Sequence, residues 1–515
     1  MRKTLTLLIA FCFVVGLNAY AQSNKVVINA DLANHKINKN IYGQFAEHLG
    51  RDIYDGIWVG EDSDIPNVDG YRKDVLEALK ELNIPVIRWP GGCFADEYHW
   101  KDGIGPRDER PTRINELWGM VPEDNSFGTH EFMKFTELVG AEPYISGNVG
   151  TGTPQEMSQW VEYLTYGGHS ELADLRRKNG RDKPWHVKYW GIGNESWGCG
   201  GNMTPEYYAD QFKRYATFLH NYPGNHLFKI ASGYSDGHYH WTEVLMQKAR
   251  WMMDGISLHY YTIAGPSWGH KGSSTDFSED LYFSALYKAN KLDEYITGHS
   301  NIMDQYDPQK RVALIVDEWG IWTDRLPGSK PGFLYQQNSL RDALVASTSL
   351  DILNHHSDRV RMANIAQMVN VLQAMVLTKG DQMVKTPTYY VFDMYKVHQD
   401  AEYLPINVDA KKYTHNGKSL SSISASASKD STGVTHITMT NLDPNNDQSV
   451  TIDIRGLNIS KVLGGRVLTA PKVNSINSFD HPNTIVPDDF NDASLSNNEL
   501  TINIPAKSVI VLGLK

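Results

Sequence analysis

Hydrophobic and polar positions follow two different patterns along the chain. From about residue 41 to residue 400, short apolar runs alternate with longer amphipathic stretches, which is typical of repeated strand–helix units. Eight apolar runs are predicted as strands, at residues 41–47, 86–89, 142–147, 187–195, 228–233, 255–260, 312–318 and 360–367. Helical periodicity predicts helices at residues 73–83, 154–166, 205–220, 281–306 and 339–355, with a last one beginning at residue 387. Eight such units predict a (β/α)8 TIM barrel.

The alternative fold for this pattern is a doubly wound open sheet. That fold commonly has a glycine-rich phosphate-binding loop after an early strand. Neither G-x-G-x-x-G nor G-x-x-x-x-G-K-[ST] follows an early strand here, so the barrel is favoured.

The pattern changes after about residue 401. Segments at residues 421–427, 435–441, 449–454 and 500–504 alternate apolar with polar side chains and are separated by turns rich in Asn, Asp, Ser and Gly. This pattern predicts a C-terminal antiparallel β-sandwich at residues 401–515. Residues 25–30 alternate in the same way, so residues 22–37 are expected to add a strand to the sandwich. The barrel then occupies residues 38–400.

The first 21 residues have the order of a secretory signal peptide. Two basic residues precede an apolar run at residues 5–17, and Ala19-Tyr20-Ala21 follows. A buried helix or a membrane anchor is the alternative, but the run is short for a membrane span. The chain is therefore expected to be secreted or periplasmic after signal-peptide removal. Two cysteines remain after residue 21, too few for a disulfide scaffold.

Composition and charge limit the possible partners. With 41% hydrophobic and 21% charged residues, the 515-residue chain is typical of a globular protein. The net charge of −11 becomes −13 once Arg2 and Lys3 are removed with the leader. This balance disfavours nucleic acid and anionic membranes, and no membrane insertion is expected. A neutral substrate fits better.

Two glutamates end apolar runs in unusual surroundings. Glu195 follows the fourth predicted strand and Glu318 ends the seventh, each close to Trp and Gly. Catalytic groups of TIM barrels lie at these carboxyl ends of the strands, so the two side chains are expected to face each other. Two carboxyl groups about 5 to 5.5 Å apart are typical of retaining glycosidases. The alternative is that each pairs with a nearby Arg or Lys, which suits loop residues such as Glu109 and Glu116 better.

The surrounding motifs resemble a known family. Asn194-Glu195 and Asp317-Glu318-Trp319 are similar to the strand ends of clan A glycosidases. More specific matches are IYGQFAEHLGR at 41–51, RWPGGCF at 88–94, WKDGIGP at 100–106, SLHYYT at 257–262 and AQMVN at 366–370. In this order they resemble the α-L-arabinofuranosidases of glycoside hydrolase family 51 over nearly the whole chain. The resemblance implies an exo-acting, retaining hydrolase that removes terminal α-L-arabinofuranosyl residues from plant polysaccharides or oligosaccharides and needs no cofactor.

The resemblance also implies roles for individual residues. Glu318 matches the nucleophile and Glu195 the acid/base. Arg88 is the cation expected to keep Glu318 ionised, and Asn194 matches the residue that hydrogen-bonds the sugar 2-hydroxyl. The remaining matches contact the sugar or surround it: Glu47 and Gln367 through hydroxyl groups, Tyr261 near the nucleophile, His259 at the rim, Trp322 as an aromatic wall, and Cys93, where some members carry an Asn.

Several alternatives stay open. Cys93 and Cys199 both follow catalytic strands, so they form either a disulfide or two free thiols. His238-Tyr239-His240 and His355-His356 lack a matching set of carboxylates, so no metal site is expected. The alternative functions are another clan A retaining enzyme, such as an endo-glucanase or xylanase, and a noncatalytic carbohydrate-binding protein. By resemblance only, the chain is expected to form a homo-oligomer, plausibly a hexamer.

Overall fold

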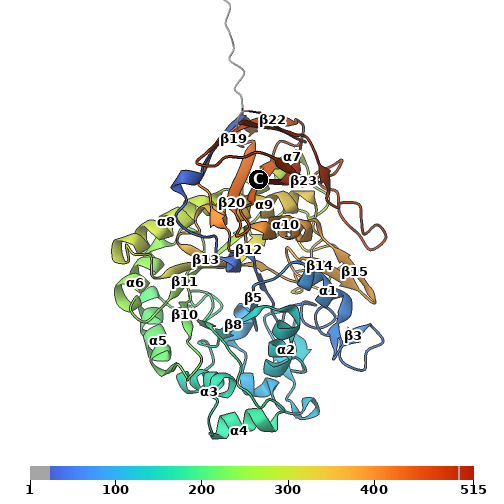
Figure 1. Ribbon diagram of the computed structural model, residues 1–515. Helices are drawn as coiled ribbons and strands as arrows, with labels where there is room; N and C mark the ends of the chain where they lie inside the picture. The colour runs from blue at the N-terminus through green and yellow to red at the C-terminus, as the bar shows by residue number, and fades with distance from the viewer. Residues whose placement is uncertain (1–23, 497–498) are drawn as a thin grey trace, which may run out of the picture.

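The computed structural model describes residues 24–496 and 499–515 as a barrel with a β-sandwich packed against one side (Figure 1). Eight parallel strands close the barrel. In order around it they are β2 (Gly43–Phe45), β5 (Val86–Trp89), β8 (Glu142–Gly147), β9 (Tyr189–Ile192), β10 (Phe228–Ala231), β11 (Gly255–Thr262), β12 (Ala313–Ile321) and β13 (Val360–Ala366), which pairs with β2. The predicted TIM barrel is confirmed.

Helices surround the barrel. They are α1 (Lys73–Glu81), α2 (Thr129–Val139), α3 (Pro154–Thr165), α4 (Glu171–Lys178), α5 (Pro205–Phe218), α6 (Tyr239–Ala249), α7 (Glu279–Ala289), α8 (Lys291–Tyr306), α9 (Leu340–His355) and α10 (Pro387–Tyr395). Three of them, α3, α5 and α10, begin with a Thr whose side chain accepts a backbone N–H and with Pro at the first helical position. The single helix predicted at residues 281–306 is instead two helices, α7 and α8, which meet at Asn290.

The sandwich consists of two sheets of mainly antiparallel strands. One has the order β17 (Ile406–Asp409), β1 (Asn24–Asn29), β22 (Gln448–Arg455), β26 (Glu499–Ile504) and β25 (Ala493–Ser496). The other has the order β16 (Glu402–Tyr403), β20 (Ile423–Lys429), β21 (Thr435–Asn441), β27 (Ser508–Leu514), β23 (Val462–Leu468) and β24 (Asp488–Phe490). Strand β1 pairs with β17 and β22, so the first described segment lies in the same sheet as the C-terminal strands.

Shorter elements line the loops. They are four hairpins, β3 (Asn67–Val68) with β4 (Tyr71–Arg72), β6 (Arg113–Asn115) with β7 (Val121–Glu123), β14 (Val376–Lys379) with β15 (Gln382–Lys385) and β18 (Lys412–His415) with β19 (Lys418–Ser421), and the 3-10 turns Ala30–Leu32, Lys39–Tyr42, Cys93–Asp96, Trp100–Gly103, Arg107–Glu109 and Lys396–His398. Within residues 24–496 and 499–515, every helix is too short or too polar to span a bilayer.

A polar cluster lies where α9 meets the sandwich. Residues 340–354 of α9 are all buried, because the helix lies between the barrel and the sheet that contains β20 and β21. The Asp351 carboxyl accepts hydrogen bonds from the hydroxyls of Ser424 (2.6 Å) and Tyr395 (3.1 Å). Burial raises the pKa of Asp351 to about 7, although these hydroxyl donors act in the opposite direction.

Replacing Asp351 by Asn is expected to change the pH dependence of stability. The folded protein keeps the carboxyl proton up to about pH 7, whereas the unfolded chain releases it near 3.8. The contribution of Asp351 to the free energy of unfolding is therefore fully present below the lower value. It is lost as the pH rises through the upper one, by on the order of 4 kcal/mol. Urea unfolding below and above this window measures the loss, which the Asn variant does not share. A stability difference between the two proteins that stays constant with pH would contradict this assignment.

Candidate active site

The two glutamates meet at the carboxyl ends of the barrel strands. Glu318 lies near the end of β12, the seventh strand, and Glu195 lies three residues after β9, the fourth. Glu318 is 6% exposed, and Glu195 is partly exposed and has a left-handed backbone (φ 37°). One carboxylate oxygen of each lies within 4.8 Å of the other. That separation suits a retaining mechanism, because inverting enzymes need about 6.5 Å or more.

A β-bulge in β12 places a further acid in the same cluster. Ser257 pairs with Ile315 and His259 pairs with Glu318, so β12 has one extra residue between these pairs. In a regular strand, Asp317 and Glu318 would point to opposite faces. Here both contact Arg88, at 3.6 Å from Nε and 2.8 Å from Nη1 respectively. The Asp317 carboxyl also accepts a hydrogen bond from the hydroxyl of Tyr144 (2.7 Å).

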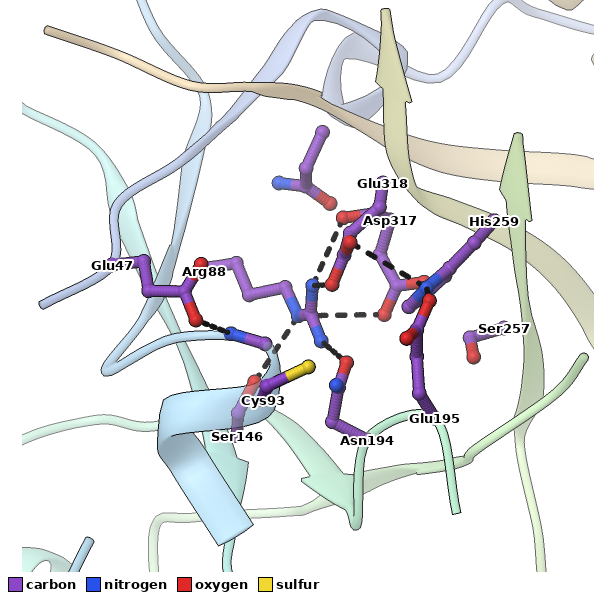
Figure 2. Close-up of polar contacts among 12 residues, drawn as sticks. Glu47, Arg88, Cys93, Ser146, Asn194, Glu195, Ser257, His259, Asp317 and Glu318 are labelled. Atoms are coloured by element: carbon purple, nitrogen blue, oxygen red, sulfur yellow. Dashed lines mark hydrogen bonds and ion pairs between the residues drawn. The ribbon is translucent and has the colours of Figure 1, made fainter. Parts of the chain in front are cut away.

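Arg88 joins the two sides of the site (Figure 2). It extends from β5, is 1% exposed, and donates to Glu318, to Asn194 Oδ1 (2.6 Å) and to Ser146 Oγ (3.1 Å). Burial disfavours its charge, but the Asp317 and Glu318 carboxylates outweigh that effect and raise the Arg88 pKa. A permanent cation therefore holds Glu318 and Asn194 in fixed positions.

His259 lies beneath both glutamates. It was expected at the rim but is 1% exposed, and its Nδ1 is 2.9 Å from Glu195 Oε1 and 3.6 Å from Glu318 Oε2. Its Nε2 is 3.3 Å from Asp317 Oδ1. Burial lowers the pKa of His259, yet Glu318, Asp317 and Glu195 together raise it to about 10. The ring is therefore an imidazolium that balances the surrounding carboxylates at neutral pH.

Tyr261 completes the surroundings of Glu318. Its hydroxyl donates to Glu318 Oε2 at 2.9 Å. The pKa of Tyr261 is raised well above its usual value, mainly by burial and also by the Glu318 carboxylate. The hydroxyl therefore remains a neutral donor. Glu318 thus receives one hydrogen bond on each oxygen, from Arg88 and from Tyr261.

Glu47 lies on the opposite wall and accepts four hydrogen bonds. They come from the backbone N–H groups of Gly92 (3.0 Å) and Phe94 (3.2 Å), from Trp118 Nε1 (3.0 Å) and from Gln367 Nε2 (2.8 Å). Burial and the nearby Glu318 raise the pKa of Glu47 to about 7. Gly92 is needed here for space, because a Cβ at this position would lie 2.6 Å from Glu318 Oε1.

Cys93 and Cys199 form a disulfide beside the acid/base candidate. The Cα atoms are 5.6 Å apart, which is ordinary disulfide geometry. Of the two possibilities left open by the sequence, the structure has the disulfide. The bridge connects the loop after β5 to the loop after β9. Cys199 Sγ lies 3.6 Å from Glu195 Oε2 and 4.0 Å from Asn194 Nδ2.

A pocket of about 320 Å³ lies over this cluster, and its lining includes Glu47, Glu195, Tyr261, Glu318 and Gln367. Trp322 stands edge-on to Tyr261 (5.1 Å between ring centroids) and to Trp268 (5.5 Å). On the opposite side Trp197 stacks on Tyr234 at 4.2 Å. The pocket therefore has carboxylates at its base and aromatic rings on its walls, which is typical of a site for one sugar ring.

Comparisons with known proteins identify the family. Two family models match, the α-L-arabinofuranosidase C-terminal domain at residues 317–508 and the α-L-arabinofuranosidase 1 domain at residues 78–266. A relative from Bacteroides ovatus, named an intracellular exo-α-L-arabinofuranosidase, is 54% identical over 96% of each chain. The crystal structure of the family 51 arabinofuranosidase from Xanthomonas axonopodis pv. citri is 51% identical, with a TM-score of 0.94 over 96% of this chain and 100% of that one. This chain belongs to the family 51 α-L-arabinofuranosidases.

More distant members of the family share the whole architecture. The α-L-arabinofuranosidase from Thermotoga maritima, solved as an arabinose complex, is 32% identical, with a TM-score of 0.83 over 95% of this chain and 99% of that one. The predictions of a family 51 glycoside hydrolase and of α-L-arabinofuranosidase activity are thus confirmed. The alternatives of an endo-glucanase or xylanase and of a noncatalytic binding protein are not supported.

One prediction about this family 51 member was wrong. The chain was expected to be secreted or periplasmic, but the Bacteroides ovatus relative, aligned over 495 residues, is named intracellular. A basic start, an apolar run and an A-x-A triplet form a short compositional pattern, which weighs less than identity along the whole chain. The proposed leader, residues 1–21, lies outside the described residues.

Several residues of the site were not among the candidates from the sequence. Asp317 was expected only as part of a strand-end motif, because neighbouring residues of a regular strand point to opposite faces. Asp96 accepts backbone hydrogen bonds from Val149, Gly150 and Asn194, and it thereby fixes Asn194. Trp118 lies in the turn between β6 and β7, where no hydrophobic periodicity marks it.

Within residues 24–496 and 499–515, two groups of side chains have the spacing of metal ligands. One is Cys93, Glu195 and Cys199, and the other is Glu195, His259 and Glu318. In the first, the two sulfurs are bonded to each other and are not thiolates. In the second, the three side chains already contact one another, with His259 Nδ1 2.9 Å from Glu195 and 3.6 Å from Glu318.

Replacing Arg88 by Lys is expected to lower kcat/KM about 100-fold or more, because one ammonium group cannot donate to Glu318, Asn194 and Ser146 together. Hydrolysis of an aryl α-L-arabinofuranoside measures the loss. Arg361→Lys is the matched control, since Arg361 is the second residue of β13 and lies at the opposite end of the barrel. An Arg88→Lys enzyme with unchanged kcat/KM would show that charge alone is sufficient.

Proposed function

We propose that Glu318 is the nucleophile and Glu195 the acid/base of a double displacement on terminal α-L-arabinofuranosyl residues. The observation that carries these roles is the pair of carboxylates within 4.8 Å, of which Glu318 alone contacts Arg88. Two donors, Arg88 and Tyr261, hold the two carboxylate oxygens of Glu318 in place for attack. Glu195 lies nearer the open side of the pocket, where a leaving group passes.

In the first step, a Glu318 oxygen bonds to the anomeric carbon as the bond from that carbon to the glycosidic oxygen breaks. Glu195 gives its proton to this oxygen, and the product is an arabinosyl ester on Glu318. His259 and Arg88 stay charged throughout and balance the carboxylates on either side of the reaction.

In the second step, Glu195 removes a proton from water. The water oxygen bonds to the anomeric carbon while the ester bond to Glu318 breaks. Two inversions give arabinose with the anomeric configuration of the substrate. Asn194, held by Arg88 and Asp96, is placed to contact the sugar 2-hydroxyl, while Glu47 and Gln367 face hydroxyls on the other wall.

The pocket favours an exo mode of action. A cavity of about 320 Å³ accommodates one terminal sugar, and Trp118, Trp322, Leu334 and Leu372 line its walls. The Bacteroides ovatus relative is named for exo activity. We infer that this chain acts on terminal arabinofuranosyl groups of plant polysaccharides or their oligosaccharides.

Aryl glycosides test the proposal directly. The purified chain is expected to hydrolyse 4-nitrophenyl α-L-arabinofuranoside and to leave the β-xyloside and β-glucoside largely intact. Proton NMR of the first-formed sugar shows whether the configuration is retained. Preference for a β-glycoside, or a first product with inverted configuration, would contradict the proposal.

We also infer a division of the chain into residues 22–37 with the sandwich, 38–400 as the barrel and 401–515 as the sandwich. The pairing of β1 with β17 and β22 supports it, although the C-terminal family model begins inside β12. Assembly as a homo-oligomer remains a prediction, which light scattering of the purified chain tests.

A further inference from the structure

A second cavity lies next to the active-site pocket. It has a volume of about 510 Å³ and extends between α7, α8 and the hairpin of β18 and β19. Three residues, Asp236, Tyr261 and Trp268, line both cavities, so the two cavities adjoin.

The hairpin of the C-terminal region is held firmly against the barrel at this place. The Tyr413 hydroxyl donates to Glu279 (2.8 Å) and its ring stands edge-on to Phe283 (5.1 Å between centroids). His415 Nε2 is 2.6 Å from Asp280 Oδ1. These contacts place Lys418 Nζ 5.1 Å from the centre of the Tyr287 ring. The sandwich side of the molecule thus contributes one wall of a cleft that reaches the catalytic pocket.

The position of the cleft matches the path of the leaving group. Glu195 must lie within hydrogen-bond reach of the oxygen that leaves. Asp236 is close to Glu195, since its backbone N–H bonds to the carbonyl of His259, which in turn contacts Glu195. Asp236 therefore lies between the acid/base candidate and the second cavity, which it lines together with Trp268.

The lining has the chemistry of a carbohydrate site. Trp268 is 52% exposed, and Tyr287 and Tyr295 are partly exposed, so aromatic rings follow one another along the cleft. Tyr295 is fixed edge-on to Tyr260 at 5.2 Å. Rings of this kind stack on the apolar faces of sugars, and Ser284, Asn416, Lys291 and Lys418 offer polar groups for hydroxyls.

We propose that this cleft binds the glycan chain that leaves with the glycosidic oxygen, a neutral pentose oligosaccharide. The inference rests on the function proposed above and adds a distal binding site to it. An enzyme of this kind holds the terminal sugar in the catalytic pocket and two or more units of the remaining chain along Trp268, Tyr295 and Tyr287. Longer substrates are therefore bound more productively than short ones.

The test compares substrates of increasing length. We expect kcat/KM to rise by at least about tenfold from dimer to pentamer in one of two series. One series is linear α-1,5-arabino-oligosaccharides, and the other is xylo-oligosaccharides that carry a single arabinofuranosyl group. In a Tyr287→Ala/Tyr295→Ala double variant the rise is expected to disappear, while kcat/KM for 4-nitrophenyl α-L-arabinofuranoside stays the same.

Two controls separate a binding role from a structural one. Tyr287→Phe/Tyr295→Phe keeps the rings and should keep the length dependence. Trp251→Ala removes an exposed ring (64%) outside both cavities and should behave as wild type. The proposal is overturned if kcat/KM of the wild-type enzyme does not change with substrate length in either series. It is also overturned if the increase in kcat/KM with length persists in the double Ala variant. A wild-type chain that does not hydrolyse the aryl arabinofuranoside instead contradicts the proposed function itself.

Discussion

A Glu318→Ala enzyme is expected to lose hydrolysis of 4-nitrophenyl α-L-arabinofuranoside by about four orders of magnitude in kcat. The side chain is the only group on the base of the pocket that contacts both Arg88 and Tyr261 within the described part of the chain. Without it the anomeric carbon has no partner for the covalent step. Stopped assays with high enzyme concentration measure the residual rate.

Azide distinguishes loss of the nucleophile from general damage. A small anion can enter the space left by the Glu318 carboxylate and attack the anomeric carbon directly, so the product should be the β-arabinofuranosyl azide. Glu109→Ala is the matched control, because Glu109 is exposed on the 3-10 turn Arg107–Glu109. If azide gives an α-configured product, or if the variant is fully active without azide, then Glu318 is not the nucleophile.

The barrel was predictable because its strands are buried on both sides. Such strands appear as short apolar runs, and residues 86–89 and 142–147 coincide with β5 and β8. Helices were harder to predict. Helices α2 and α6 lack the Thr-Pro start that marked α3, α5 and α10, and the break between α7 and α8 has neither Pro nor Gly.

The site was predictable only where it follows strands. Glu195, Glu318 and Arg88 lie on or just after strands, so the barrel topology alone predicts that they lie close together. Asp317 was not predicted as a site residue, because regular strand alternation would point its side chain away from the site. Only the bulge in β12 places it there. The second cavity was not predicted either, because its walls join α7 and α8 to the β18–β19 hairpin, more than a hundred residues later in the chain.

Replacing Glu195 by Gln is expected to slow hydrolysis in proportion to how much the leaving group needs a proton. An oligosaccharide leaves as a basic alkoxide, so its release should fall by about 10³-fold or more, whereas a dinitrophenolate needs little help. A plot of log kcat/KM against leaving-group pKa should therefore be much steeper for the variant than for wild type. Gln keeps the shape and can still accept the hydrogen bond from His259.

Glu195→Gln should also respond to azide differently from Glu318→Ala. Glu318 still forms the arabinosyl ester, and azide, which needs no base, then attacks that ester and gives the α-configured azide. Glu206→Gln, an exposed substitution in the first turn of α5, provides the control. If both variants show the same dependence on leaving-group pKa, or the same azide product, then Glu195 and Glu318 do not have the separate acid/base and nucleophile roles proposed here. Opposite azide configurations from the two variants would assign the acid/base and the nucleophile in one comparison.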